Sequence, residues 1–313
     1  MRLTWPTAPA SDQRLLIGIS GGRDSVALLH LLLEAGFKDL VLCHCNHLLR
    51  ADESDGDETF VRKLAADLSL PCEVTRVDVA SLAEHSSRSI ELAAREARYG
   101  FFEKCAETFE SPHLVLGHHM DDQAETALFN LLRGSSSIQG MKPLRQRGGL
   151  TIHRPLLSSR REELTRYLSA RNIPFREDSS NAGLSHTRNR LRHQALPLLQ
   201  EIMQRDCIPP LARAAADQQQ RLATLDHFLD PQGRLFLPAL TSLPPAFQTQ
   251  VLYLFLRQAE VPDISARLLA ATLSLLDPAA PAKVNLPGGR HLRRKEKRIF
   301  IPDETSEKHV DLK

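Results

Sequence analysis

The chain has 313 residues, of which 42% are hydrophobic and 25% charged, with a formal net charge of +2. These values are ordinary for a globular protein, and the length suffices for a large core and two domains. No run of about 20 apolar residues is present, so we expect no membrane span. Residues 1–12 lack the apolar core of a signal peptide. The cysteines are odd in number and include no C-x-x-C pair, which favours a reduced, cytoplasmic protein.

A glycine-rich turn near the N-terminus organises the rest of the chain. An apolar run at 15–19 predicts a short buried strand, and residues 26–33 predict a helix. Between them lies Ser20-Gly21-Gly22-Arg23-Asp24-Ser25. Glycine lets backbone N–H groups approach a phosphate, and the start of a helix adds unpaired donors and partial positive charge. The turn therefore predicts an anion site, with Asp24 able to hold a divalent cation beside a phosphate.

Several interpretations of this turn compete. It lacks the lysine of a Walker loop, G-x-x-x-x-G-K-S/T, so it does not belong to that class. Residues 18–22 fit G-x-S-x-G, the nucleophile elbow of hydrolases. The turn also resembles the S-G-G-x-D-S loop of the PP-loop ATP pyrophosphatases and matches it at every fixed position. The remaining interpretation is a tight turn that only caps a helix.

Strands and helices alternate along the N-terminal part of the chain. Apolar runs at 39–45, 72–77 and 114–117 predict further strands, and 52–70 and 89–107 predict helices. This alternation predicts an α/β fold with a doubly wound, mostly parallel sheet. Ligands bind such sheets at the carboxyl ends of the strands. The glycine-rich turn and the segments 44–50 and 118–126 all follow strands, so we expect them to converge on one crevice.

The charge distribution changes after residue 126. The span 127–161 contains no Asp or Glu but carries Arg133, Lys142, Arg145, Arg147, Arg154, Arg160 and Arg161. Residues 134–137 and the pair Gly148-Gly149 predict a loop-like conformation for it. A second basic segment without acidic residues spans 187–193. Such segments often form only a solvated face, but two of them beside a nucleotide site favour a polyanionic partner, most simply a nucleic acid.

The last third of the chain predicts a smaller unit. Residues 211–229 predict a connecting helix, and Pro231, Pro238, Pro244 and Pro245 mark the passage into a second domain. Helices are predicted at 246–258 and 265–276, and strands at 284–286 and 298–302 flank a basic stretch at 290–298. We expect a catalytic domain at 1–208, a helical linker at 209–230 and a small α+β domain at 231–313.

Further motifs follow one another in a fixed order. Residues 118–126 fit H-H-x-D-D-x-x-E-T, residues 177–181 fit E-D-x-S-N, and residues 188–192 fit R-N-x-L/I-R. Together with 20–25, 44–50, 90–99 and Arg154-Pro155-Leu156-Leu157, they resemble the bacterial tRNA(Ile)-lysidine synthetases over about the first 200 residues. The C-terminal third resembles the small C-terminal domain of that family only loosely.

The resemblance implies a two-step reaction. ATP adenylates the C2 oxygen of the wobble cytidine in the CAU anticodon of tRNA(Ile), and pyrophosphate leaves. The ε-amine of free L-lysine then attacks C2 and displaces AMP, which gives lysidine. The implied partners are ATP, L-lysine and tRNA(Ile) with a CAU anticodon, the implied cofactor besides ATP is Mg2+, and the family allows a homodimer.

The resemblance also implies roles for particular side chains. Asp24 would bind magnesium and phosphate, and Arg95, which could face one site together with Arg98, would bind the activated nucleotide. Asp122 and Glu125 would hold the lysine amine, since an ammonium group needs carboxylates. The expected catalytic residues are thus Asp24, Arg95 and Asp122. The ATP site would comprise Ser20, Gly21, Gly22, Arg23, Asp24, Ser25 and His44, and the tRNA contacts would be Arg133, Arg188, Arg190, Arg293 and Arg294.

Without the resemblance, the residues predict only an ATP-using α/β enzyme with a nucleic-acid partner. Another tRNA-modifying enzyme of the superfamily, such as a tRNA thiolase, is an alternative, although the absence of a C-x-x-C pair counts against it. A serine hydrolase with Ser20 as nucleophile would act without ATP and leaves Asp24 and Ser25 unexplained. A non-catalytic module would bind ATP or RNA without forming pyrophosphate.

Overall fold

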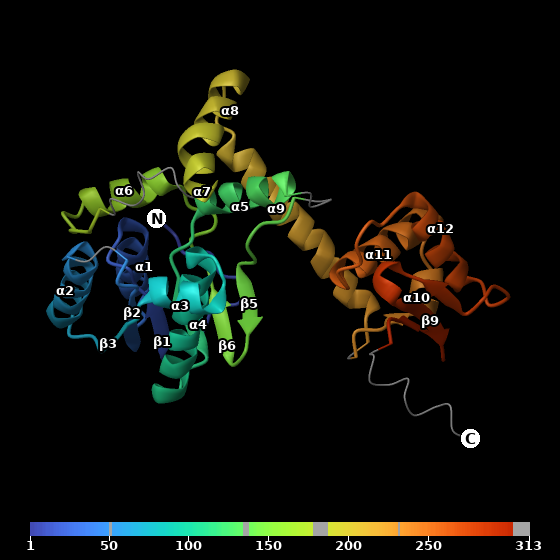
Figure 1. Ribbon diagram of the computed structural model, residues 1–313, viewed down its shortest axis with the longest axis horizontal. Coiled ribbons are helices and arrows are strands. Elements are labelled where there is room, and N and C mark those ends of the chain that lie inside the picture. The colour runs from blue at the N-terminus through green and yellow to red at the C-terminus, as the bar shows by residue number, and fades with distance from the viewer. Residues whose placement is uncertain (50–51, 134–137, 178–186, 231, 303–313) are drawn as a thin grey trace. The chain divides into compact units, whose positions relative to one another are not determined.

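The computed structural model describes residues 1–49, 52–133, 138–177, 187–230 and 232–302 (Figure 1). For residues 219, 221–224 and 226 it describes the backbone only. The chain divides into two compact units, Met1–Ala215 and Ala216–Lys313. Helix α9 (Ile208–Ala223) continues across this division, and the predicted domain boundaries at residues 208 and 230 stay predictions. Within the described part of the chain, no helix is long and apolar enough to cross a membrane.

The first unit is built on a six-stranded sheet with the strand order β3-β2-β1-β4-β6-β5. Neighbouring strands pair in parallel except β5, which is antiparallel to β6. The predicted α/β fold with a doubly wound, mostly parallel sheet is confirmed. The ends of β1 and β4 flank the topological switch point, where α/β sheets bind ligands. The strands are β1 (Leu15–Gly18), β2 (Leu40–Asn46), β3 (Cys72–Arg76), β4 (His113–Leu116), β5 (Leu144–Arg147) and β6 (Leu150–His153).

Side chains of strand β1 alternate between two cores. Leu15 and Ile17 belong to a core shared with α1 (Arg23–Glu34), α2 (Asp52–Asp67) and α6 (Arg161–Ser169). Leu16, between them, belongs to a second core shared with α4 (Ile90–Thr108). Strand side chains alternate between the faces of a sheet, so a strand covered on both faces is apolar throughout. This is why residues 15–19 form an uninterrupted apolar run.

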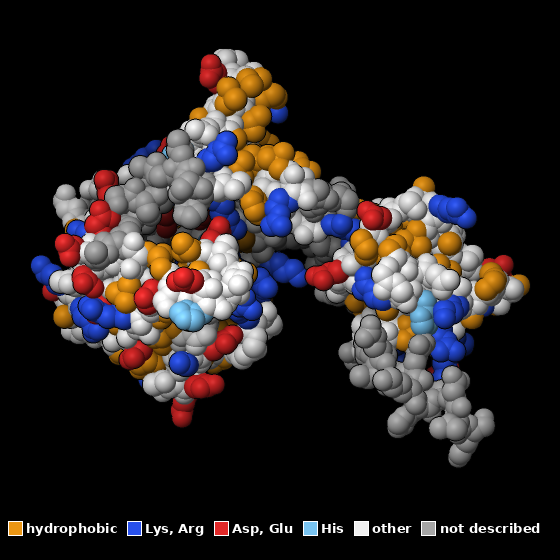
Figure 2. All heavy atoms as spheres, in the orientation of Figure 1, with side chains coloured by type: hydrophobic (Ala, Val, Ile, Leu, Met, Phe, Trp, Pro, Cys, Tyr) orange, Lys and Arg blue, Asp and Glu red, His pale blue; other side chains and the backbone are white. Residues whose placement is uncertain are grey.

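The other helices of the first unit follow the strands or connect them. Between α7 and α8, Leu191–Ala195 form a π-helical turn, a feature that is frequent at functional sites. Helix α8 exposes the side chains of Leu198, Ile202 and Met203, visible as an orange group in Figure 2. These helices are α3 (Val79–Ser86), α5 (Met120–Leu132), α7 (Thr187–Arg190) and α8 (Leu196–Met203).

The prediction of a loop-like conformation for residues 127–161 is wrong for part of that span. Strands β5 and β6 form an antiparallel hairpin within it, and β6 joins the main sheet beside β4. Gly148, with φ +54°, and Gly149 make the hairpin turn, so the two glycines mark a turn between strands. Leu150 and Ile152 are fully buried, but an apolar pattern of four residues is too short to indicate a strand. Residues 134–137 lie outside the described residues.

The second unit has its own sheet and core. Its four strands have the order β7-β10-β9-β8 and pair antiparallel, which confirms the predicted small α+β domain. The prediction of a basic stretch lying between two strands is wrong, because most of that stretch forms strand β9. Leu292 is buried in the core while Arg293 beside it is exposed, as expected of a strand with one covered face. The elements are β7 (Leu235–Phe236), α10 (Leu237–Thr241), α11 (Pro245–Gln258), α12 (Ala266–Leu273), β8 (Lys283–Asn285), β9 (His291–Lys295) and β10 (Arg298–Phe300).

Several histidines of the first unit are buried in a neutral state. His153 is 3% exposed, and its Nε2 lies 3.1 Å from Nδ1 of His113. Burial lowers the pKa of His153 to about 4 and that of His118 to about 3. Burial, with the nearby charge of Arg98, also lowers the pKa of His47 to about 4. The folded chain therefore binds fewer protons on these rings than the unfolded chain does in weak acid.

We expect the free energy of unfolding of the first unit to fall as the pH is lowered from 6.5, the ordinary pKa of histidine, to about 4. The unfolded chain takes up protons in this range whereas the folded chain does not, so acid favours unfolding. His153→Gln should reduce this pH dependence by on the order of 1–3 kcal/mol. Denaturant unfolding at pH 7 and pH 4 measures it. His193→Gln, which changes an exposed histidine, is the control, and equal pH dependence in both variants would contradict the prediction.

Candidate functional site

The glycine-rich turn is held in shape by its own side chains. Ser20 Oγ accepts a hydrogen bond from the Gly22 N–H at 3.2 Å. Ser25 Oγ donates to the Gly22 carbonyl at 2.9 Å and accepts from the Ser20 N–H at 3.2 Å. Gly21 has φ +85°, a conformation that glycine adopts readily and other residues do not. The backbone is thus fixed at the start of α1, where free N–H groups and the helix dipole favour an anion.

Two neighbouring segments hold the turn in place. The Arg176 N–H donates to the Gly21 carbonyl at 2.9 Å, and the Arg176 guanidinium pairs with Asp57 at 3.1 Å. Gly117 follows β4, and a Cβ on it would lie 2.9 Å from the carbonyl oxygen of Asp24. The end of β4 can therefore approach the start of α1 this closely only with glycine at position 117.

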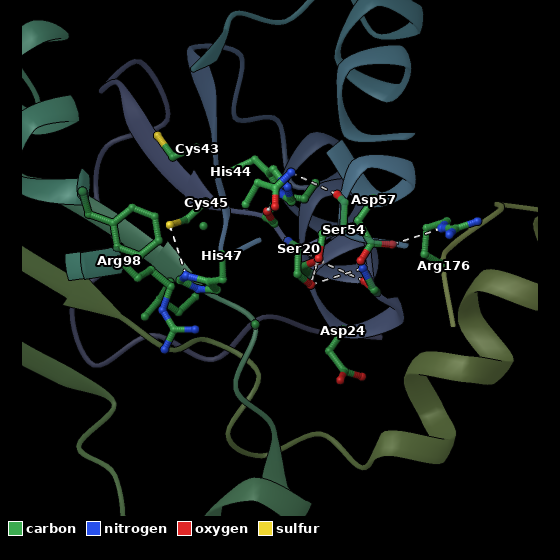
Figure 3. A pocket seen from close by; sticks show the side chains of 18 of the residues that line it. Ser20, Asp24, Cys43, His44, Cys45, His47, Ser54, Asp57, Arg98 and Arg176 are labelled. Carbon is green, nitrogen blue, oxygen red and sulfur yellow. Dashed lines mark hydrogen bonds and ion pairs between the residues drawn. The ribbon is translucent and has the colours of Figure 1, made fainter. Parts of the chain in front are cut away.

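A cavity of about 450 Å³ opens beside the turn (Figure 3). Its lining includes Ser20, Asp24, His44 and Asp122, which come from the ends of β1, β2 and β4 and the helices after them. His44 Nδ1 lies 2.9 Å from the Ile19 carbonyl, to which it donates, and His44 Nε2 has no partner among the described residues. Burial lowers the pKa of His44, so its ring is neutral and Nε2 is a hydrogen-bond acceptor.

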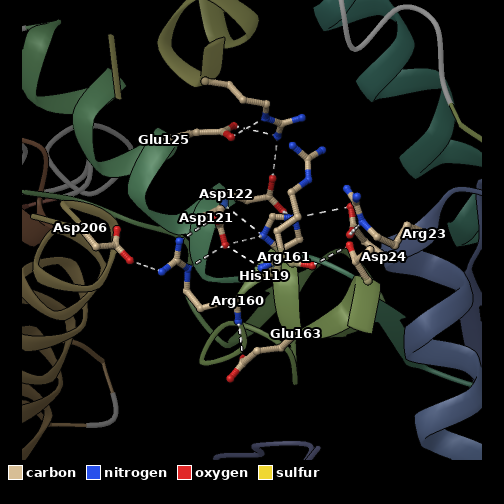
Figure 4. A network of polar contacts seen from close by, with 12 residues as sticks. Arg23, Asp24, His119, Asp121, Asp122, Glu125, Arg160, Arg161, Glu163 and Asp206 are labelled. Carbon is tan, nitrogen blue, oxygen red and sulfur yellow. Dashed lines mark hydrogen bonds and ion pairs between the residues drawn. The ribbon is translucent and has the colours of Figure 1, made fainter. Parts of the chain in front are cut away.

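A fully buried histidine joins the turn to helix α5 (Figure 4). His119 caps this helix: its Nδ1 accepts from the Asp122 N–H at 3.4 Å, and the Asp122 carboxylate accepts from the His119 N–H at 3.1 Å. Its Nε2 lies 3.4 Å from Asp24 Oδ2 and 3.5 Å from Asp122 Oδ2. Since Nδ1 accepts, Nε2 carries the proton of the neutral ring and faces the two carboxylates at ion-pair distance, without a hydrogen bond to either among the described residues.

In this network the histidine and the carboxylates stabilise each other's charged forms. Burial opposes protonation of His119, but the carboxylates of Asp122, Asp24 and Asp121 outweigh burial and raise the pKa of His119. Burial also opposes ionisation of Asp24, yet His119 and Arg23 lower the pKa of Asp24 well below its usual range. Asp24 is therefore a carboxylate at any physiological pH.

Arg192 occupies the two carboxylates that are predicted to bind an amine. Its Nε lies 2.5 Å from Glu125 Oε1, and its Nη2 lies 2.9 Å from Glu125 Oε2 and 3.0 Å from Asp122 Oδ1. Glu125 is 4% exposed, and burial raises its pKa against the opposing effect of Arg192. Two-pronged pairing of this kind is the strong form of guanidinium–carboxylate recognition. The carboxylate pair is thus a cation site, filled by a side chain of the π-helical turn.

The carboxylates near the turn fit a metal ion that arrives with a phosphate. Among the described residues, no group of three or more His, Cys, Asp or Glu side chains could hold a metal by itself. Asp24 offers one ionised, partly exposed carboxylate at the anion site. Magnesium is commonly bound by one or two carboxylates together with substrate phosphates and water. Asp24 matches that donor set, whereas a resident metal centre would need more ligands.

Most of the residues predicted for ATP and the amine line the cavity, but Gly21, Arg23, Glu125 and Arg95 do not. Arg95 does not line the cavity; its Cζ lies 5.1 Å from the centre of the Tyr99 ring, and Arg98 lines the cavity instead. Gly21, Arg23 and Glu125 lie beside lining residues in the same elements. The predicted residues that line the cavity are Ser20, Gly22, Asp24, Ser25, His44 and Asp122.

The residues predicted to bind tRNA are spread over both units. Arg133, Arg188 and Arg190 are exposed on the first unit. On the second unit Arg293 is exposed, whereas Arg294 donates to four backbone carbonyls between residues 275 and 280. A structural role accounts for Arg294, and its contact with tRNA stays a prediction.

The sequence assigns no role to Arg176 or Arg192, and it offers Arg98 only as a helical neighbour of Arg95 that could face the same site. Arg98 shares a helix face with Arg95, and the spacing alone does not say which of them reaches the cavity. No local pattern marks Arg176, whose contacts are with residues far away in the chain. Arg192 stands in a basic motif that suggests phosphate binding, and only the fold reveals that it contacts carboxylates.

The fold and the site define a nucleotide-binding domain, with an anion-binding turn at the switch point of a parallel sheet. The PP-loop domain family matches residues 1–199, and the TilS substrate binding domain family matches residues 235–300. The chain belongs to the PP-loop ATP pyrophosphatase family, and it combines that domain with a TilS substrate binding domain.

Curated relatives support the same assignment. A tRNA(Ile)-lysidine synthase from Chlorobaculum tepidum is 38% identical over 226 residues, which cover 71% of this chain and 66% of that protein. One from Thermus thermophilus is 36% identical over 301 residues, which cover 93% of this chain and 57% of that protein. The resemblance drawn from the motifs is confirmed, and the chain spans about three fifths of the length of these two relatives.

A solved structure shares the fold. The U34-tRNA thiolase NcsA from Methanococcus maripaludis superimposes with a TM-score of 0.54 and 15% sequence identity, over 70% of this chain and 72% of that chain. At this identity the likeness concerns the arrangement of the sheet and helices alone.

Gly117→Ala is expected to weaken ATP binding by about tenfold or more, a change of at least ~1.4 kcal/mol. The added Cβ would collide with the carbonyl of Asp24 and displace the start of α1. Isothermal titration with ATP measures the effect. Gly149→Ala is the control, because a Cβ at that position meets nothing within 4 Å. Equal affinities for the two variants would show that the close approach of β4 is not needed for ATP binding.

Proposed function

We propose that the protein ligates L-lysine to C2 of the wobble cytidine in the CAU anticodon of tRNA(Ile), with conversion of ATP to AMP and pyrophosphate. The observation that carries the proposal is that the glycine-rich turn and Asp122, one carboxylate of the pair that holds Arg192, line one cavity and approach the same ring of His119. The reaction requires this combination, because its substrates include a triphosphate and an ammonium group. The names of the relatives point to the same reaction.

The turn at 20–25 serves the first step, in which the C2 oxygen of cytidine attacks the α-phosphorus of ATP and pyrophosphate leaves. Backbone N–H groups at the start of α1 bind the phosphates that depart. Asp24 would hold Mg2+ together with those phosphates, and the ion would neutralise charge on the leaving group. His44 offers its neutral Nε2 to an amino group such as that of adenine. Arg98, in the cavity wall, offers positive charge to the activated nucleotide.

The carboxylates of Asp122 and Glu125 serve the second step, in which the lysine amine attacks C2 and displaces AMP. They already hold the guanidinium of Arg192, so their charge and spacing suit a cationic side chain. Lysine binding therefore requires that its ammonium group replaces Arg192. The ammonium group must lose a proton before attack, and Glu125, whose pKa burial raises, is the better proton acceptor of the pair.

The geometry argues against the two rival enzymes. In the part of the chain that the structure describes, Ser20 Oγ contacts Ser25 and the Gly22 N–H but no histidine that could activate it as a nucleophile. All five cysteines are free, and the described residues form no metal-binding cluster that would carry sulfur chemistry. We also propose that tRNA contacts the exposed arginines Arg133, Arg188, Arg190 and Arg293.

The test is incorporation of radiolabelled lysine into unmodified tRNA(Ile) with a CAU anticodon, with and without ATP and Mg2+. We expect incorporation that depends on ATP and is lost when the wobble C is changed to U. Formation of AMP and pyrophosphate without incorporation of lysine would contradict the substrate assignment. Failure to form either product would contradict the assignment of an active PP-loop enzyme.

Asp24→Ala is expected to lower AMP formation by about 10²-fold or more, because the carboxylate proposed to bind Mg2+ is removed. Asp67→Ala, which changes an exposed carboxylate on α2, is the control. A quench assay with labelled ATP measures AMP. Equal rates in the two variants would remove Asp24 from the site.

Arg192→Gln is expected to tighten the binding of free lysine, in the absence of tRNA, by about tenfold. The variant removes the guanidinium that competes for Asp122 and Glu125. Isothermal titration with lysine measures the affinity, and Arg190→Gln, an exposed neighbour in the same segment, is the control. An unchanged lysine affinity in Arg192→Gln would mean that lysine does not use this carboxylate pair.

A further inference from the structure

Arginines gather around Tyr99 on helix α4, apart from the contacts described above. Tyr99 is 2% exposed. The Cζ atoms of Arg147 and Arg95 lie 4.2 Å and 5.1 Å from the centre of its ring, within the range of a cation–π interaction. Arg154 lies close enough to the Tyr99 side chain to interact with it electrostatically. Guanidinium groups from α4, from β5 and from the end of β6 therefore lie around this one tyrosine.

The positive charge of this group is not balanced. Arg145 lies close enough to Arg154 to disfavour its charge, and Arg95 disfavours the charge of Arg98 in the same way. Among the described residues, only Glu103 forms an ion pair with any of the five arginines, at 3.7 Å from Arg147 Nε. Like charges held this close repel one another, and the buried Arg154 is also removed from water without a carboxylate partner among the described residues. The group therefore suits an anion that comes from outside the protein.

Arg154 is the fixed centre of this group. It is 4% exposed, and its Nη1 donates to the Lys142 carbonyl at 2.7 Å. Its Nε has no hydrogen-bond partner among the described residues. Buried polar atoms are almost always satisfied, so a held side chain with an unused donor indicates a missing acceptor.

The group adjoins the cavity. Arg98 lines the cavity and lies on the same helix as Arg95 and Tyr99. Arg154 directly follows β6, at the edge of the sheet where the glycine-rich turn lies, because β6 runs parallel to β4. Arg145 and Arg147 continue the positive charge along β5, and Figure 2 shows Lys and Arg side chains where Figure 1 places this strand. The charge therefore extends from the cavity wall to the β5–β6 hairpin.

We propose that Arg95, Arg98, Arg145, Arg147 and Arg154, arranged around Tyr99, bind the sugar–phosphate backbone of RNA beside the nucleotide that enters the cavity. The proposal rests on the proposed function and names the place where the RNA backbone is held. A single-stranded loop presents one phosphate per nucleotide and can meet several separate guanidinium groups, whereas one small anion cannot. Arginine binds phosphate oxygens two at a time, and such contacts position RNA without reading its sequence.

The test compares Arg145→Gln, Arg147→Gln and the double variant with the unchanged protein in filter binding of unmodified tRNA at several salt concentrations. Each single change should weaken tRNA binding about 3- to 10-fold and lower the slope of log K against log salt by about 1. The loss should be the same for a tRNA with another anticodon, because phosphate contacts carry no sequence information. The KM values for ATP and lysine should not change. Arg166→Gln, an exposed arginine on α6, is the control and should bind tRNA like the unchanged protein.

Two outcomes would overturn the proposal. One is tRNA affinity and salt dependence in the double variant equal to those of the Arg166→Gln control. The other is a raised KM for ATP with unchanged tRNA binding, which would assign the arginines to the nucleotide. The proposed function is tested separately, since lysine incorporation by the unchanged protein is measured before any variant is compared.

Discussion

The site depends on one buried ring, that of His119, held between Asp24 and Asp122. Its Nε2 lies within 3.5 Å of one oxygen of each carboxylate, and both carboxylates are partly exposed. The ring therefore places an N–H group between two like charges that come from different helices. Because Asp24 stands at the start of α1 and Asp122 at the start of α5, the ring also joins the two helices that follow β1 and β4.

The placement of these two helices explains why anion and cation chemistry can meet at one point. Both helices begin at the switch point of the sheet and direct partial positive charge toward it. On α1 the N–H groups stay free for a phosphate, since Ser20 and Ser25 bond within the turn. On α5 the first turn is capped by His119, and its carboxylates contact Arg192, Arg160 and His119. The start of α1 therefore favours a phosphate, whereas the start of α5 favours an ammonium or guanidinium group.

Local patterns in the sequence predict much of the fold and one half of the site. The apolar run at 15–19 and the glycine-rich turn after it are contiguous, so propensity and spacing suffice to predict strand, turn and helix. Contacts between distant segments leave no such pattern. Arg192 meets Glu125 across 67 residues, and Arg176 meets Asp57 across 119. The hairpin of β5 and β6 is also not predicted, because its strands are short and one of them carries two arginines.

The charged residues also show that contacts between distant segments cannot be predicted from the sequence. A formal net charge of +2 averages over arginines in two different settings. Arg160, Arg176 and Arg192 are paired with carboxylates and fix the elements around the cavity. Arg95, Arg98, Arg145 and Arg154 form no ion pair with a carboxylate of the described residues, and for the buried Arg154 such isolation is costly. Composition cannot separate these settings, because pairing depends on which segments the sheet brings together. An arginine that the fold pairs with a carboxylate stabilises the protein by itself, whereas one that the fold leaves unpaired beside a cavity has its natural counter-charge on a substrate.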